Sequence, residues 1–196
     1  MQRMMVFSTP FWKKFDLAAL LLAFALAMPL QLAAQTHGID VRHATVTTAD
    51  DHYLLEADID IILSAPLEEA LHKGIPLYFL LEFEMVRLRW YWFNDKAVSR
   101  QQQYRLQFNA LTRQYRIGVG SFYQNFPTLA EALQVMTKVR RREDLDAGTL
   151  SKGTGYMAGL RLRLDTSQLP KPFNLNALGS REWNIGSDWV RWAVTP

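Results

Sequence analysis

The run IPLYFLLEFEMVRLRWYWFN, residues 75–94, is mostly apolar and aromatic and carries only two acids and two arginines. It is too polar for a membrane helix and too rich in Phe, Tyr, Trp and Val for a surface helix. We therefore predict a long central β-strand, around which the rest of the chain is built.

Alternation of polar residues within this strand predicts an irregularity. Glu82 and Glu84 point to one face, opposite the apolar residues at odd positions. Further on, the polar residues Arg87 and Arg89 occupy odd positions instead. This switch indicates a β-bulge near Met85–Val86 or a strand that passes from one covered face to the other, and we favour the bulge. A strand of this length would far exceed the usual roughly five or six residues, so a bend is expected.

The first 34 residues have the order of a secretory signal peptide. A basic start (Arg3, Lys13, Lys14) precedes an apolar run over residues 17–30 and a small-residue stretch that ends at Ala34. We predict a helical leader that is cleaved after Ala34 and a periplasmic location. The alternative is an uncleaved leader that anchors the protein to the inner membrane, but the run is shorter than the ~20 residues of a membrane span.

Residues 35–196 are expected to form a single periplasmic β-rich domain, which is long enough to bury a core of its own. Without the leader the chain has 19 basic and 18 acidic residues, a net charge of +1, so no global charge favours nucleic acid. The chain contains no cysteine, which excludes disulfides, thiolate metal sites and a lipidated cysteine.

Hydrophobic alternation predicts further strands at regular intervals. Short polar turns join the first two into an antiparallel hairpin and join residues 75–94, 100–111 and 114–121 into a meander. A last segment with three tryptophans is expected to close an edge. The predicted strands besides the central one are residues 39–47, 53–63, 100–111, 114–121, 156–166 and part of 183–194.

Two short helices are predicted at about residues 65–73 and 127–141. Ser64 and Pro66 begin the first and Gly74 ends it, while Pro127 or Thr128 begins the second. We read the charged residues that follow, 140–146, as an exit from the second helix. The fold class is mainly β, an antiparallel β-sandwich or a curved meander sheet of about seven or eight strands.

Two groups of residues are candidate metal ligands. Glu56, Asp58 and Asp60 share one face of a strand, where they could bind a divalent cation through oxygens. We instead expect them to pair with Arg87, Arg89 or Arg105 on a neighbouring strand. The histidines, which lack a zinc-like spacing, are expected at the surface. They are His37, His43, His52 and His72.

No recognisable catalytic motif is present. The loop 148–155 resembles a phosphate cradle, but Lys152 precedes a glycine and the loop leads into a strand, so a connector is favoured. Ser121, Ser151 and Ser187 lack a glycine-flanked elbow. We predict no enzyme, no catalytic residue and no cofactor.

Arginines and tryptophans cluster at two places and form the candidate interaction surface. Such clusters dominate binding interfaces, and sugars stack on indole rings, although tryptophans also fill cores. The candidate residues are Arg87, Arg89, Trp183, Trp189, Arg191 and Trp192.

Four segments resemble an uncharacterised family of exported proteobacterial proteins, DUF4390. They are RLRWYWFNDK (87–96), YRLQFNALTRQYRIG (104–118), RLRLDTSQLPKPFNLNAL (161–178) and WNIGSDWVRWAV (183–194). The resemblance implies a single exported domain without an established activity. Genes of this family often lie beside the gene of a membrane sensor histidine kinase, which implies the periplasmic part of such a kinase as a partner.

The sequence therefore favours a non-enzymatic exported interaction module, accessory to a sensor kinase or an envelope complex. The alternative is a protein that binds a small ligand or glycan through exposed Trp and Arg, and an enzyme of unrecognised type is a third hypothesis.

Overall fold

β3 (Leu77–Arg87) lies inside the larger of two sheets and confirms the predicted central strand where it is described. The computed structural model describes residues 38–49, 51–87, 95–146, 148–171, 180 and 182–196. The chain divides into two units, residues 1–35 and 36–196, and every described residue belongs to the second. The predicted leader and residues 88–94 of the predicted strand lie outside the described residues.

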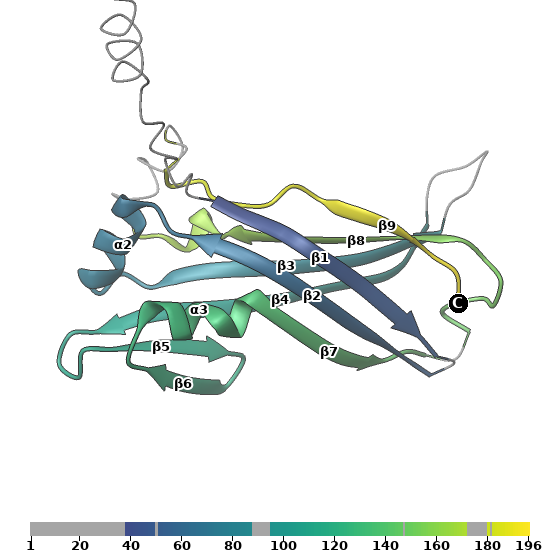
Figure 1. Ribbon diagram of the computed structural model, residues 1–196, viewed down its shortest axis with the longest axis horizontal. Coiled ribbons are helices and arrows are strands. Elements are labelled where there is room, and N and C mark those ends of the chain that lie inside the picture. Colours follow the sequence, from purple (N-terminus) through teal and green to yellow (C-terminus); the bar gives the residue numbers. More distant parts are fainter. Residues whose placement is uncertain (1–37, 50, 88–94, 147, 172–179, 181) are drawn as a thin grey trace, which may run out of the picture. The chain divides into compact units, whose positions relative to one another are not determined.

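The larger sheet has six strands in the order β6-β5-β4-β3-β8-β9, all antiparallel to their neighbours (Figure 1). β3, β4 and β5 form the predicted meander, which β6 extends. The other edge of β3 pairs with β8, which follows much later in the chain. The strands besides β3 are β4 (Asp95–Asn109), β5 (Gln114–Val119), β6 (Phe122–Phe126), β8 (Tyr156–Leu164) and β9 (Val190–Val194).

The predicted bulge is present, but its extra residue lies in the neighbouring strand. Met85 pairs with Val98 and Val86 pairs with Lys96, so Ala97 of β4 has no partner on β3. The ladder between β3 and β8 runs past the same point without a shift. β3 therefore keeps its alternation, and its last residue lies on the same face as Met85.

The smaller sheet has three antiparallel strands in the order β1-β2-β7. β1 (Gly38–Thr48) and β2 (His52–Ile62) form the predicted hairpin. As predicted, β2 buries one face and turns its acids outward. Its buried residues are Tyr53, Leu55, Ala57 and Ile59.

β7 (Lys138–Asp144) corrects the sequence prediction, which assigned residues 138–141 to the second helix and the rest to a charged exit. Val139 is 3% exposed and points into the core, whereas Lys138 and Arg140 point outward. In the ladder these two bases lie opposite Asp58 and Glu56 of β2. Opposite charges in register stabilise a strand pair, so the charged run forms an edge strand instead of a helix.

Two helices connect the sheets, near the predicted positions. α2 (Ala65–His72) begins after Ser64, whose hydroxyl donates to the carbonyl of Glu182 at 2.5 Å and does not cap the helix. α3 (Leu129–Thr137) begins after Thr128, whose side chain accepts from the backbone N–H of Glu131 at 3.2 Å. Each helix buries its apolar face against the sheets.

β6 was not predicted from the sequence, while β9 forms the edge that the tryptophan-rich segment was expected to close. β6 reads FYQNF and has no buried residue, and Phe122 is 82% exposed. A strand that buries neither face shows no alternation, so its pattern carries no signal.

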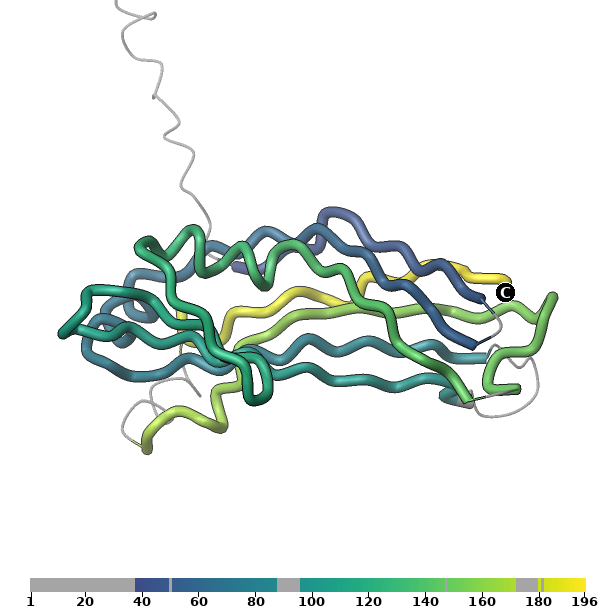
Figure 2. The backbone as a smooth tube through the Cα atoms, turned by 90° about the horizontal axis from the view of Figure 1, so that it is seen from below, coloured from purple at the N-terminus to yellow at the C-terminus, as the bar shows by residue number. Residues whose placement is uncertain are grey.

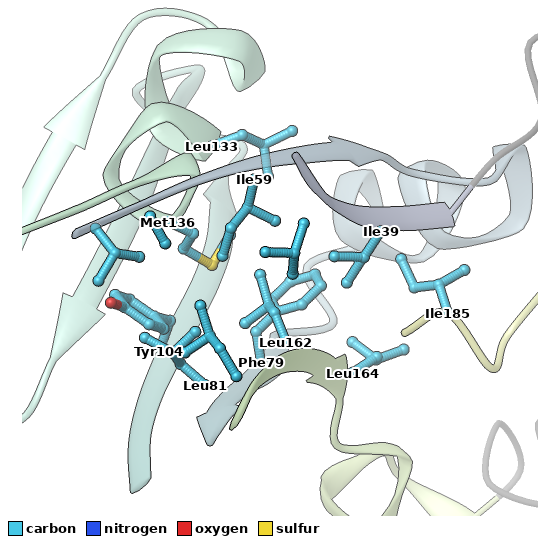
Figure 3. Packing of buried hydrophobic residues seen from close by; sticks show 14 of the residues in the cluster. Ile39, Ile59, Phe79, Leu81, Tyr104, Leu133, Met136, Leu162, Leu164 and Ile185 are labelled. Carbon is cyan, nitrogen blue, oxygen red and sulfur yellow. The ribbon is translucent and has the colours of Figure 1, made fainter. Parts of the chain in front are cut away.

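The two sheets pack face to face around one hydrophobic core, which makes the fold a β-sandwich with nine strands in the described residues (Figures 2 and 3). The ring of Tyr53 from the smaller sheet lies 5.2 Å from that of Phe83 in the larger one. Among the described residues, no helix is both long and apolar enough to cross a membrane.

Candidate interaction surface

The outer face of the six-stranded sheet, which points away from the smaller sheet, carries a buried carboxylate. Glu82 of β3 is 8% exposed and lies opposite Arg161 of β8. Nε of Arg161 donates to Oε2 of Glu82, and Nε of Arg163 donates to the same oxygen at 3.1 Å. Nε2 of Gln101 donates to the other carboxylate oxygen at 3.3 Å. Glu82 thus holds two arginines in fixed positions.

These contacts change the acidity of Glu82. Burial raises the pKa of a carboxyl group, but the hydrogen bonds and charges of Arg161 and Arg163 outweigh this effect. The pKa of Glu82 therefore lies below its usual value, and the carboxylate is ionised at neutral pH.

A tryptophan packs beside this cluster. The Cζ atoms of Arg161 and Arg191 lie 4.7 and 5.5 Å from the ring centroid of Trp189. Gly159 of β8 provides the space, because a Cβ atom there would lie 3.2 Å from Cε3 of Trp189. Each cation–π contact contributes about 0.5–1 kcal/mol at an exposed site.

We call Glu82, Arg161, Arg163, Trp189 and Arg191 the outer arginine face. Strand register places more bases than acids on this side of the sheet. On its described strands the outward bases are Lys96, Arg105, Arg116, Arg161, Arg163 and Arg191, and the outward acids are Glu82 and Glu84. Lys96 pairs with Glu84 at 2.9 Å, so the excess is positive.

The structure brings together only part of the predicted surface. Trp189 and Arg191 lie on the outer arginine face. Trp192 pairs with Ala158 on the opposite face of the sheet, where it packs half-buried against the core. Trp183 is 9% exposed and belongs to the core. Arg89 lies outside the described residues.

Arg87 does not belong to the outer arginine face and instead lies at the end of β3. Its Nη2 donates to the hydroxyl of Tyr156 at 3.0 Å and to Oγ of Ser151 at 3.2 Å. The backbone N–H of Ser151 donates to the same tyrosine oxygen at 2.9 Å. Burial raises the pKa of Tyr156, but these donors outweigh it and the pKa is lowered. Arg87 thus holds the loop 148–155 against the sheet.

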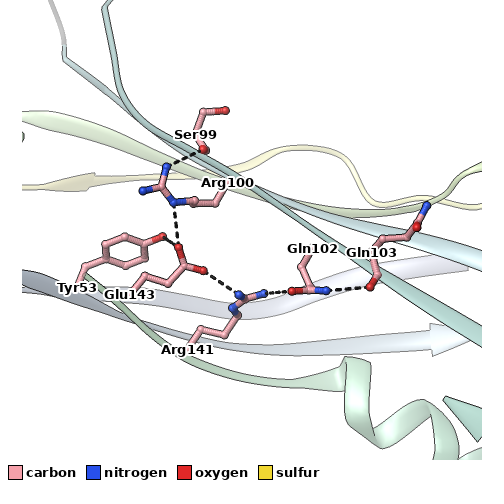
Figure 4. Close-up of polar contacts among 7 residues, drawn as sticks. All are labelled: Tyr53, Ser99, Arg100, Gln102, Gln103, Arg141 and Glu143. Carbon is pink, nitrogen blue, oxygen red and sulfur yellow. Dashed lines mark hydrogen bonds and ion pairs between the residues drawn. The ribbon is translucent and has the colours of Figure 1, made fainter. Parts of the chain in front are cut away.

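A second polar cluster joins the two sheets (Figure 4). Glu143 of β7 accepts from the hydroxyl of Tyr53 at 3.1 Å, from Arg100 at 3.0 Å and from Arg141 at 2.8 Å. Arg141 also donates to Oε1 of Gln102 at 2.9 Å. Burial and the charge of Glu143 raise the pKa of Tyr53, so its hydroxyl stays protonated and remains a donor. These contacts hold the sheets together.

The acidic row on β2 has other partners than those predicted. Glu56 pairs with Arg140 of β7 at 3.4 Å and Asp60 with Arg42 of β1 at 2.7 Å, rather than with Arg87 or Arg105. For Glu56 the prediction failed because it did not identify β7 as a neighbouring strand, whereas Arg42 lies on β1, the predicted hairpin partner of β2. In the described residues, no three or more His, Asp or Glu side chains group as metal ligands.

Three of the four histidines are described, and His37 lies outside these residues. Nδ1 of His52 lies 2.6 Å from Oδ1 of Asp51. Nε2 of His72 lies 2.9 Å from the hydroxyl of Tyr115. His43 and His72 are exposed as predicted, whereas His52 is half-buried.

The loop and the serines have structural contacts. The N–H of Gly153 donates to the carbonyl of Pro196 at 3.0 Å, which ties the loop 148–155 to the end of the chain. Oγ of Ser187 accepts from the backbone N–H of Leu162 at 3.0 Å. Ser121 is exposed in the turn between β5 and β6.

Sequence reasoning missed Glu82, Arg161 and Arg163 as members of the site. The alternation in RLRL at residues 161–164 was the available signal that the two arginines point outward. What it could not supply was the pairing of β3 with β8, which alone brings the carboxylate to the arginines.

Two antiparallel sheets around one core, with a basic and aromatic outer face, define a β-sandwich with a candidate binding surface. The chain belongs to the DUF4390 family, a domain of unknown function whose family profile matches residues 36–193. No curated protein and no solved structure matches the chain.

Proposed function

We propose that this protein is a non-enzymatic interaction module, exported to the periplasm, which binds another envelope protein through the outer arginine face. The observation that carries the proposal is the stack of Arg161, Trp189 and Arg191. Tryptophan and arginine are the residues that contribute most at protein interfaces. Glu82 fixes the arginines before a partner arrives, which reduces the entropy lost on binding.

The excess of basic side chains favours a partner with an acidic surface, because complementary charge speeds and orients association. The leader-like order of residues 1–34 supports export. The periplasmic part of a membrane sensor histidine kinase, which the family resemblance implies, is the first partner to test.

The alternative, a small-ligand or glycan site built from Trp189 and Trp192, has less support. A joint stacking platform needs both indoles on one surface, whereas these two lie on opposite faces of the sheet. The guanidinium groups of Arg161 and Arg191 also lie over the ring of Trp189, where a sugar would stack.

The test is affinity purification from the native host after chemical crosslinking, with mass spectrometry of the captured proteins. The double variant Trp189→Ala/Arg191→Glu removes the indole and reverses one charge. The matched control, Leu54→Ala/Arg142→Glu, makes the same kinds of change on the outer face of the smaller sheet, where the two residues pair across β2 and β7.

We expect the unaltered protein and the control to capture the same envelope protein and the site variant to lose it. Raising the salt concentration should weaken the capture, because exposed charges are screened. A clean monomer without a repeatable partner, or equal capture by both variants, would contradict the proposal.

A further inference from the structure

β6 is an edge strand without a charged residue. It ends the larger sheet, and the described residues have three other edge strands, β9, β1 and β7 (Figure 1). β9 carries Arg191, β1 carries Asp40 and Arg42, and almost every residue of β7 is charged. Charged side chains at an edge oppose pairing with another chain. The sequence of β6, FYQNF, lacks this protection.

β6 also carries aromatic side chains that its own chain leaves uncovered. Phe122 is 82% exposed and Tyr123 is 56% exposed, and no residue of the strand is buried. Pairing of this edge with another strand would cover part of the open apolar surface. Burial of apolar surface favours association, so the exposed aromatic residues mark the edge as a contact surface.

The backbone of β6 has hydrogen-bonding groups to offer at its far edge, where the described residues place no strand. A two-residue turn joins β5 to β6, so the closing pair Val119 and Phe122 bonds within the hairpin. Because these bonds alternate along a strand, the N–H and C=O groups of Tyr123 and Asn125 point away from β5. Such groups are a template for a further strand.

The occupant that fits this edge is a second copy of β6, because FYQNF is self-complementary in the antiparallel direction. Two copies that pair about Gln124 place Phe122 of each opposite Phe126 of the other. Tyr123 then lies opposite Asn125, and their outward backbone groups form the hydrogen-bonded pairs. A pairing centred on any other residue of β6 leaves part of the strand without a partner. Closed dimers form through a patch that fits itself, as this strand does.

We propose that this chain forms a two-fold symmetric dimer in which the β6 strands of two copies pair and join their larger sheets into one. Neighbouring strands share the faces of a sheet, so the two outer arginine faces lie on the same side of the joined sheet. A strand of five residues buries less than the roughly 1,200 Å² of a stable interface, so the dimer is weak and depends on concentration. β6 and β9 are opposite edges of the sheet, and the dimer does not depend on the proposed function.

Site-directed disulfide formation tests the pairing, since the chain has no cysteine of its own. In the dimer, Gln124 faces its own copy as a non-hydrogen-bonded pair, whose Cα atoms lie about 4.5 Å apart, within the reach of a disulfide. The variant is Gln124→Cys. The matched control is Ser121→Cys, also at an exposed residue, whose two copies would lie roughly 20 Å apart along the strands. With oxidised glutathione, we expect Gln124→Cys to form the covalent dimer at least about tenfold faster than Ser121→Cys on non-reducing gels.

Sedimentation velocity of the full chain over a concentration series measures the dissociation constant. Gln124→Lys places two lysines directly opposite each other, and we expect it to weaken the dimer about fivefold. Ser121→Lys adds the same charge outside the paired strands and should leave the dimer unchanged, as should Trp189→Ala/Arg191→Glu.

Three results would each overturn the proposal: a monomer at every concentration into the millimolar range, equal disulfide rates for the two cysteine variants, or equal effects of the two lysine variants. Loss of the dimer in Trp189→Ala/Arg191→Glu alone would also overturn it, because the contact would then lie on the other edge.

Discussion

Glu82 shows how one residue organises the candidate surface. Among the described residues it is the one buried side chain that carries a charge at neutral pH, and its partners Arg161 and Arg163 come from a strand about eighty positions later. A buried carboxylate is stable only when it is paired and hydrogen-bonded. The two arginines are therefore needed to stabilise Glu82 in the folded protein as well as for the proposed binding.

Glu82→Gln is expected to lower the free energy of unfolding by about 1.5 kcal/mol at neutral pH, because hydrogen bonds to charged groups are lost. The folded protein depresses the pKa of Glu82, so its stabilising effect is fully present above the ordinary value of 4.5. The effect disappears as the pH falls through the lower pKa of the folded state.

Urea denaturation of both proteins over a series of pH values measures this difference. The two unfolding free energies should converge in acid. A difference that stays constant from neutral pH into acid would show that the charge of Glu82 does not stabilise the fold.

At the scale of elements, the predictable strands are those that bury one face. Residues 53–63 and 156–166 alternate clearly, and the structure has strands at both. The sequence placed a bulge near Met85–Val86 from a switch in the parity of charged residues. A bulge lies at that point, but β3 keeps its alternation and the extra residue is Ala97 of β4, so the stated reason was wrong. β6 buries no face, so its sequence does not predict a strand. The charged run of β7 can be recognised as a strand only when the acids of β2 are known to lie opposite it.

β7 also connects the two sheets, because its residue Glu143 contacts Arg100 of the larger sheet. We expect Glu143→Gln to lower the free energy of unfolding by about 2 kcal/mol, since its partners Arg100 and Arg141 lose a charge-assisted contact. Tyr53→Phe removes one hydroxyl and should cost about 1 kcal/mol. In the double variant the loss should be smaller than the sum, because both changes break one network.

Urea denaturation of the two single variants and the double variant gives the coupling. Strict additivity would mean that Tyr53 and Glu143 do not act together, and it would contradict the assigned contact.

At the scale of the whole molecule, one core lies between the sheets, and both sheets depend on it. The alternation predicted a mainly β fold, either a sandwich or a curved meander sheet, since most strands have one apolar face, and the structure is the sandwich. The alternation could not predict that β8 and β9 complete the larger sheet beside β3, because nothing local in the sequence encodes a pairing between distant strands. For the same reason the candidate site was only half predicted, with Trp189 and Arg191 named and their neighbours missed.

Leu162, fully buried in β8, tests the common core. We expect Leu162→Ala to lower the free energy of unfolding by about 2–5 kcal/mol and the protein still to unfold in one transition. Leu111→Ala, at a side chain that is 96% exposed, is the matched control and should change stability by less than about 0.5 kcal/mol. Equal effects, or two separate transitions by circular dichroism and fluorescence, would disagree with a single core.

Binding of an envelope protein by the outer arginine face is tested most directly by site-specific photo-crosslinking in the native host. A photoreactive amino acid at Ala193, exposed on β9 beside Arg191, should capture a partner. The same group at Thr47, exposed on β1 in the smaller sheet, should not capture that partner. Capture of the same protein from both positions, or from Thr47 alone, would contradict the assignment of the binding face.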